Sequence, residues 1–273
     1  GKRVFNTFAA GSPNTPPFPG DGKAWEGSED SDFFKYKKSN AGFNNVTVKG
    51  LAGDDEVDVE LSGGPGNGDG HIKNVVIDVG SGDDRISLIR KNNLYIQDST
   101  IVGGDGEDFL YLSSDEIHGV KAEAEIVRVD SSGNGKISDL NFDANDVQIK
   151  VGNDFNNSII NAELVKIESK GNGAPTDIRI CAKEINFTAS NNLFSSTLSA
   201  QNFKVELKGN GSIENSKFFG IRSRSDGAVI DLTANNAFKK SSIYGGAGRD
   251  KIYLKSKQDK FNKSLIYGGL GDD

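Results

Sequence analysis

The sequence predicts an all-β fold: a right-handed parallel β-helix, or β-solenoid, of about nine coils with Gly/Asp-rich turns stacked along one edge. Three observations support this prediction. A Gly-Asp motif recurs along the chain, and apolar residues alternate with polar ones on both sides of it. No segment shows a long, capped apolar pattern with the period of a helix, so helices should be scarce.

The clearest copy of the motif is GGDGED, residues 103–108. The other copies are GGAGRD (245–250), GGLGDD (268–273), VGSGDD (79–84), GLAGDD (50–55) and the weaker GSEDSD (27–32). Three stretches keep only the glycines of the turn: DSSGNG (130–135), ESKGNG (168–173) and ELKGNG (206–211). Successive copies are 23 to 29 residues apart, except for three intervals of 38 or 39 residues in the middle of the chain. We therefore expect one coil per copy, with an extra excursion in each of the three long coils.

Strands are predicted on both sides of each turn. Apolar residues stand two and four positions after the last Asp of the motif: Val57 and Val59, Ile86 and Leu88, Leu110 and Leu112, Ile252 and Leu254. The same alternation precedes the turn at Val46 and Val48, and at Val75 and Ile77. A serine also recurs two residues before an isoleucine, at Ser99, Ser241 and Ser264. Period-2 alternation indicates strands with one buried face, whose apolar residues would stack from coil to coil into a continuous core.

Stacked coils also stack their turns, so acidic residues far apart in the sequence are expected to lie together. Ca²⁺ takes about six to eight oxygen ligands, and glycines let backbone carbonyls converge without Cβ clashes. A cation between stacked carboxylates would also offset their mutual repulsion. We therefore expect several Ca²⁺ ions and no other cofactor. The candidate metal ligands are Asp32, Gly50, Asp54, Asp55, Asp83, Asp84, Gly103, Asp105, Asp108, Gly245, Asp250, Gly268 and Asp273.

Two stretches, GGDGEDFLY (103–111) and GGAGRDKIY (245–253), fit the pattern G-G-x-G-x-D-x-U-x, in which U is apolar. In this pattern the chain resembles the RTX (repeats-in-toxin, hemolysin-type) calcium-binding repeat proteins. The resemblance implies that turn carbonyls and the sixth-position Asp hold Ca²⁺ between adjacent coils. RTX repeats follow one another every nine residues, whereas here one copy occurs per coil, so a wider β-helix is expected. The sixth-position Asp is missing from the three middle stretches, so we expect no such metal between 135 and 211.

Composition narrows the function classes. The net charge of −7 argues against a nucleic-acid partner, and no apolar run is long enough to insert into a membrane. The single cysteine, Cys181, excludes an internal disulfide. We expect residues 1–22, which hold four of the six prolines, to be an extended arm or linker, and 23–273 to be one solenoid domain. The chain has no Met and stops within a motif, so we expect the solenoid to continue in a longer polypeptide.

Three further patterns are alternatives to the repeat. The stretch DSSGNGKISDLN (130–141) imitates an EF-hand loop but ends on Asn141 where that loop uses a Glu, so a structural turn is favoured. Asp115, Glu116 and His118 lie close together, and Arg222 and Arg224 alternate, as active-site residues on a β-helix could. None of these forms a catalytic signature, and His71 stands in a Gly-rich insertion. We assign no catalytic residue.

The sequence therefore favours a calcium-stabilised extracellular module that folds on Ca²⁺ binding after export. It would be part of a surface layer, an adhesin or a fibre at the cell surface. Its expected partners are other coils or subunits of the same protein, and cell-surface glycans. The alternative is a polysaccharide-active lyase, hydrolase or epimerase on the same scaffold.

Overall fold

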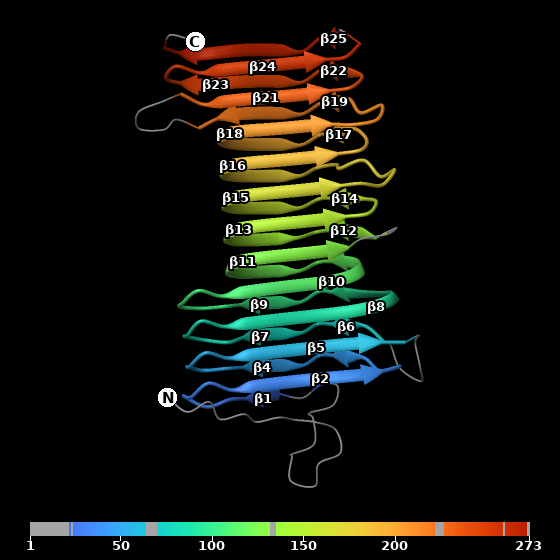
Figure 1. Cartoon of the computed structure of the whole chain (residues 1–273), viewed down its shortest axis with the longest axis vertical. Coiled ribbons are helices and arrows are strands. Elements are labelled where there is room, and N and C mark those ends of the chain that lie inside the picture. The colour runs from blue at the N-terminus through green and yellow to red at the C-terminus, as the bar shows by residue number, and fades with distance from the viewer. Residues whose placement is uncertain are drawn as a thin grey trace. The chain divides into compact units, whose positions relative to one another are not determined.

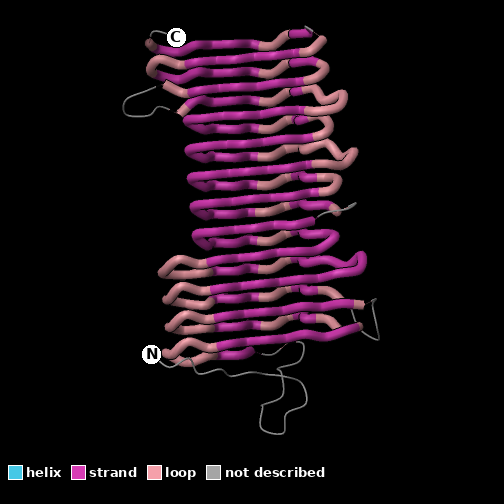
Figure 2. Tube along the Cα trace, viewed as in Figure 1, coloured by secondary structure: helices cyan, strands magenta, loops and turns pink. Residues whose placement is uncertain are grey.

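The computed structural model describes residues 22, 24–63, 70–131, 135–221, 227–258 and 260–271. Over these residues the chain is all-β and its parallel strands form a β-solenoid of about 11 turns, with no helix (Figure 1 and Figure 2). The predicted fold class is confirmed, with about 11 turns in place of about nine. The described part of the chain contains no helix long and apolar enough to cross a membrane. The chain divides into two compact units, residues 1–131 with 141–145, and residues 132–140 with 146–273.

The first unit is built from strands of 2 to 13 residues joined by turns. Its strands are β1 (Ala24–Glu26), β2 (Phe33–Ser39), β3 (Phe43–Asn44), β4 (Thr47–Lys49), β5 (Glu56–Ser62), β6 (Ile72–Lys73), β7 (Val76–Asp78), β8 (Arg85–Gln97), β9 (Thr100–Val102), β10 (Phe109–His118) and β11 (Lys121–Ser131). Parallel pairing runs from coil to coil through β2, β5, β8, β10 and β11, and separately through β1, β4, β7, β9 and β11.

The core of this unit is a set of apolar rows that run across the coils. In one row the register joins Phe34 to Val57, Ile86, Leu110 and Val127, all of them buried. The predicted apolar pairs of this unit, before and after each turn, are likewise buried. Alternate residues in each strand face inward, and the strict register stacks each inward residue on the one before it.

The second unit repeats this construction. Its strands are β12 (Lys136–Ser138), β14 (Phe155–Asn156), β15 (Ile159–Ser169), β16 (Arg179–Ala189), β17 (Leu193–Phe194), β18 (Thr197–Leu207), β19 (Ile213–Glu214), β20 (Lys217–Gly220), β21 (Val229–Ala234), β22 (Ala237–Lys239), β23 (Ser242–Ala247), β24 (Lys251–Ser256), β25 (Lys260–Asn262) and β26 (Leu265–Leu270). Strand β13 (Asn141–Val151) has residues in both units. A buried row joins Ile160, Ile180, Leu198, Phe218 and Ile243.

The long intervals of the sequence contain additional coils, so the predicted excursions are wrong. Hydrogen bonds between successive coils here join residues 18 positions apart, as from the Leu140 N–H to the Ser158 Oγ, or 20 apart, as from the Ser196 N–H to the Ser216 Oγ. Coils with a Gly-Asp turn are longer: Val75 bonds to Ser99, 24 positions on. Two coils of about 18 to 20 residues therefore fill an interval of 38, because their strands turn the corner without a glycine loop.

One corner recurs in every coil and marks the repeat better than the glycine motif. At this corner a residue adopts a positive φ: Asn45, Asn74, Asp98, Gly119, Asp139, Asn157, Asp177, Ser195, Asn215, Lys240 and Lys263. Asn and Asp tolerate this left-handed region better than other residues with a side chain. Where a serine follows, its hydroxyl bonds within its own corner and accepts an N–H from the preceding coil; Ser216 does both. The recurring serine of the sequence is thus a corner residue.

Candidate functional site

The Gly-Asp turns of the first unit stack directly on one another. Backbone bridges join Ala52 to Ser81 and Ser81 to Asp105, the third positions of three successive turns. The second and fourth positions all have positive φ: Leu51 and Gly53, Gly80 and Gly82, Gly104 and Gly106. The turns therefore share one backbone conformation, and glycine suits five of these six positions because it carries no Cβ.

The sixth-position aspartates form a buried row along this edge. The Oδ1 of Asp55 accepts a hydrogen bond from the Asp32 N–H at 2.7 Å, and the Oδ1 of Asp84 accepts one from the Asp55 N–H at 2.6 Å. The Oδ1 of Asp108 continues the row with the Asp84 N–H at 3.0 Å. Glu125 of β11 ends it by accepting the Asp108 N–H at 2.9 Å. Each of these aspartates thus ties its coil to the coil before it from inside the turn.

The fifth-position residues form a second row on the solvent side. The Asp54 N–H donates to the Ser31 Oγ at 3.0 Å, and the Asp83 N–H donates to the Asp54 Oδ1 at 3.1 Å. The Glu107 N–H continues this row to the Asp83 Oδ1 at 3.0 Å. Asp105 is also exposed. The structure therefore separates the predicted ligands: Asp54, Asp83 and Asp105 face solvent, whereas the sixth-position residues are enclosed.

The enclosed carboxylates each keep one oxygen without a partner. The Oδ2 atoms of Asp55, Asp84 and Asp108 are buried and make no hydrogen bond. These residues are 4%, 2% and 1% exposed. A buried, unpaired carboxylate oxygen is costly because it has lost its water without gaining another donor. Three such atoms in successive turns are the arrangement that a row of cation sites requires.

In the turns of Asp55 and Asp108, the glycine at the first position leaves the space that the free oxygen needs, whereas the turn of Asp84 begins with Val79. A methyl group at Gly50 would overlap the Oδ2 of Asp55 and the backbone carbonyl oxygen of Val79 in the next coil. A methyl group at Gly103 would overlap the Oδ2 of Asp108. At Gly50 a carboxylate oxygen and a carbonyl oxygen from adjacent coils therefore converge beside the first position of the turn, whereas at Gly103 the three nearest atoms all belong to Asp108.

The buried row titrates well above the range of ordinary carboxylates. Burial, together with the nearby carboxylates of Asp32 and Asp54, raises the pKa of Asp55 to about 6. Burial raises the pKa of Asp84 to about 7, with added repulsion from Asp108 and Asp55. Burial also raises the pKa of Asp108 to about 6, assisted by Glu125. At pH 7 and above, these three carboxylates are therefore increasingly ionised, although their burial disfavours the charged form.

The second unit has a comparable edge. Asp250 is 4% exposed, and its Oδ1 accepts the Ala228 N–H from the preceding coil at 2.6 Å. A methyl group at Gly245 would overlap the Gly268 carbonyl oxygen and lie 2.7 Å from the Oδ2 of Asp250. The predicted ligand Asp273 lies outside the described residues. Gly245, Asp250 and Gly268 are thus brought together as the sequence predicted.

This donor set suits a metal ion that accepts backbone oxygen. Among the described residues, no group of three or more His, Cys, Asp or Glu side chains could hold a metal ion. The turns of Asp55, Asp84 and Asp108 instead each offer one buried carboxylate oxygen that makes no hydrogen bond, and beside Gly50 a backbone carbonyl oxygen lies close to it. Ca²⁺ uses carbonyls and carboxylates in flexible geometry, whereas Zn²⁺ sites are built from Cys and His side chains. The residues present therefore fit Ca²⁺.

The competing patterns have structural explanations where they are described. Strand β12 occupies the middle of the EF-hand-like stretch, which is therefore not a single loop, although 132–134 lie outside the described residues. His71 and His118 flank Tyr95, with ring centroids 3.3 Å and 5.3 Å from it. Both histidines thus belong to an aromatic stack across three coils. Arg222 and Arg224 lie outside the described part of the chain.

Comparison with family models, with curated proteins and with solved structures finds no match to this chain in any of the three.

Proposed function

We propose that the chain is a calcium-stabilised, extracellular structural or adhesive module of the RTX type, in which Ca²⁺ ions occupy the stacked Gly-Asp turns. The observation that carries this proposal is the row of buried, unpaired Oδ2 atoms of Asp55, Asp84 and Asp108. An aspartate that served only to accept a backbone N–H would place its second oxygen in water or against a donor. The second oxygen of Asp55 lies instead in the space beside Gly50, which the carbonyl oxygen of Val79 also approaches.

The proposed mechanism couples ion binding to stacking of the coils. Ca²⁺ would neutralise the buried carboxylates and supply the attraction that their second oxygens lack. Because the ligands come from adjacent coils, the site exists only in the folded chain, so the binding free energy adds to the free energy of unfolding. Calcium is scarce inside cells and plentiful outside, so the turn-bearing coils would close after export.

The fold supports a structural or adhesive role for the stabilised solenoid. Parallel coils expose broad faces of outward side chains, suited to contact with other subunits or with cell-surface glycans. A surface layer, an adhesin or a fibre would use such faces repeatedly.

A calcium titration tests this proposal. Circular dichroism and thermal unfolding are followed from micromolar to millimolar Ca²⁺, then after EGTA, with Mg²⁺ at the same concentrations as the control. Each occupied site adds about 2.7 kcal/mol at 100 times its Kd, so we expect a rise in Tm that EGTA reverses. Mg²⁺ should raise the Tm less than Ca²⁺ does, because Mg²⁺ demands strict octahedral geometry and keeps its bound water. An unchanged Tm across the calcium range would refute the proposal.

A further inference from the structure

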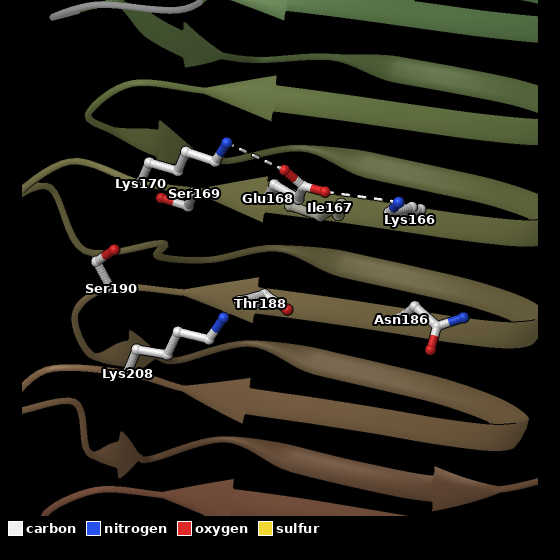
Figure 3. Close-up of a pocket in the computed structure, with 9 residues that line it drawn as sticks. All are labelled: Lys166, Ile167, Glu168, Ser169, Lys170, Asn186, Thr188, Ser190 and Lys208. Carbon is white, nitrogen blue, oxygen red and sulfur yellow. Dashed lines mark ion pairs between the residues drawn. The ribbon is translucent and has the colours of Figure 1, made fainter.

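A groove of about 340 Å³ lies on the second unit, away from the Gly-Asp turns. Its walls come from three successive coils, through the ends of β15 and β16 and the residue that follows β18 (Figure 3). Strand register sets Lys166 beside Asn186 and Glu168 beside Thr188. Outward residues of neighbouring coils therefore form short rows that line the groove, and parallel pairing fixes their spacing at about 4.8 Å.

The groove carries an excess of positive charge in a chain whose net charge is −7. Lys166 and Lys170 both pair with Glu168, at 3.5 Å and 3.4 Å. Lys208, the third lysine, has no ion pair with any described residue, and in Figure 3 its side chain extends toward the strand that carries Thr188. Three lysines and one glutamate leave two uncompensated positive charges along this wall.

Apart from Ile167, the remaining lining residues carry hydroxyl or amide groups. Ser169, Ser190 and Thr188 offer hydroxyls, and Asn186 offers a side-chain amide. No aromatic ring is among the residues that line the groove. The volume is at the lower end of the range for small-ligand sites, about 300–1,000 Å³. The combination of free cation, hydroxyls and amide matches a ligand that carries both an anionic group and many hydroxyls.

We propose that this groove binds an acidic saccharide. The Nζ of Lys208 pairs with the anionic group of one sugar, while Thr188, Ser190 and Asn186 bond to ring hydroxyls. Glu168 holds Lys166 and Lys170 in fixed positions at the other side of the groove. A carboxylate and a sulfate group share this chemistry, so both uronate and sulfated sugars are candidates. The inference goes beyond the calcium proposal, since none of these residues belongs to a Gly-Asp turn.

Titration calorimetry on the full chain in millimolar Ca²⁺ tests the inference. The probes are hyaluronan oligosaccharides, which carry uronates, chitin oligosaccharides of the same length as a neutral control, sulfated dextran, and inorganic sulfate. We expect the hyaluronan oligosaccharides to bind and the chitin oligosaccharides not to bind. Lys208→Gln should weaken binding by about tenfold, the loss of one charge-assisted hydrogen bond. Lys183→Gln removes the same charge from an exposed position of β16 outside the groove, and should leave binding unchanged.

Several results would overturn the inference. One is that neither hyaluronan nor sulfated dextran binds. Another is that Lys208→Gln and Lys183→Gln weaken saccharide binding equally. A third is that inorganic sulfate, at equal charge, competes for the groove as well as the oligosaccharides do. Thr188→Val provides a second check, because it keeps the side-chain shape and removes only a hydroxyl; unchanged affinity in this variant would also contradict the assignment. Circular dichroism shows that each variant is folded, and saturating calcium keeps a failure of the calcium proposal separate from a failure of this one.

Discussion

Replacing Asp84 with asparagine separates the two roles that its carboxylate could have. The asparagine side chain retains an Oδ1 that can accept the Asp55 N–H, the 2.6 Å bond of the native chain. The replacement removes the negative charge and the second carboxylate oxygen, the atom that lacks a partner. A purely structural aspartate would tolerate this change in all conditions. A calcium ligand would tolerate it only when calcium is absent.

The size of the effect follows from the pKa. Burial raises the pKa of Asp84 from 3.8 to about 7, so keeping the carboxylate ionised at pH 8 destabilises the folded chain. At about 1.4 kcal/mol per pKa unit the full shift corresponds to about 4 kcal/mol, and solvent screening reduces it to about 2 kcal/mol. Asp84→Asn should therefore raise the metal-free Tm at pH 8 by about 4–8 °C, since 1 kcal/mol corresponds to about 2–4 °C at this chain length.

Thermal unfolding at pH 8, with EGTA and with millimolar Ca²⁺, measures both roles. Calcium should raise the Tm of the native chain and have a much smaller effect on the Tm of Asp84→Asn. Asp84→Asn should therefore have the higher Tm in EGTA, and the native chain the higher Tm in Ca²⁺. Asp83→Asn is the matched control, because it removes the same charge from the exposed neighbour in the same turn. It should change stability by less than about 0.5 kcal/mol in either condition. An equal calcium shift in the native chain and in Asp84→Asn would refute the reasoning.

The remaining predictions concern the same turns. Because burial raises the pKa of the three enclosed aspartates above their unfolded values, the stability they contribute is present below about pH 4 and is lost as the pH rises through about 6 to 7. The metal-free Tm should thus be higher at pH 5 than at pH 8, and calcium should reverse this order. Leu51→Gly should stabilise by about 1 kcal/mol, because Leu51 has a φ of 89° where its counterparts are glycine; Leu51→Ala keeps the strain and should show no gain by urea unfolding. Gly50→Ala should destabilise by about 2–3 kcal/mol by urea unfolding, since its methyl would overlap Asp55 and Val79; an unchanged midpoint would contradict the turn geometry. In EGTA, amide hydrogen exchange should become faster in residues 79–84 and stay slow in β16. Equal exchange rates in both segments would contradict the distinction between coils with a Gly-Asp turn and the shorter coils.

The fold could be predicted because its two main signals are local and repeated. Period-2 alternation around Val57 and Ile86 fixes which side chains face inward, and the glycine motif fixes where the backbone turns. Repetition then leaves stacking as the only way to bury every apolar row. The alignment of Asp55 with Asp84 follows from that stacking, although 29 residues separate them.

The number of coils could not be obtained from the glycine motif. The coils between residues 135 and 211 lack that turn, so there the motif occurs only once for every two coils. Their regular mark is the corner at Asn157, Asp177 and Ser195, where φ is positive. Asn and Asp at such a corner are a weak signal, because both residues are common in any loop. The spacing of 18 to 20 residues becomes visible only once the pairing is known.

The separation of the acidic residues into an exposed fifth-position row and a buried sixth-position row could not be predicted from the sequence either. Asp83 and Asp84 are adjacent in the chain, yet one is exposed and the other is 2% exposed. Alternation of side chains across the backbone separates them, and only the inner one has an oxygen that lacks a donor. Composition alone gives both residues the same weight as ligands. The geometry favours Asp84.

The two kinds of coil differ in what holds them closed, and this decides where a ligand can act. Coils of 18 to 20 residues turn their corners within continuous strands such as β15 and β16, whose backbone groups pair with neighbours and whose inner positions are apolar. Coils with a Gly-Asp turn add residues that cost backbone entropy, about 1–2 kcal/mol each, and they bury carboxylates that repel one another. Both costs arise in the same turn. In the proposed mechanism, one ion bound between adjacent turns would offset both costs by fixing the glycines and neutralising the charge. Removal of calcium would then open the turn-bearing coils and leave the shorter coils paired, because the shorter coils lack the Gly-Asp turn.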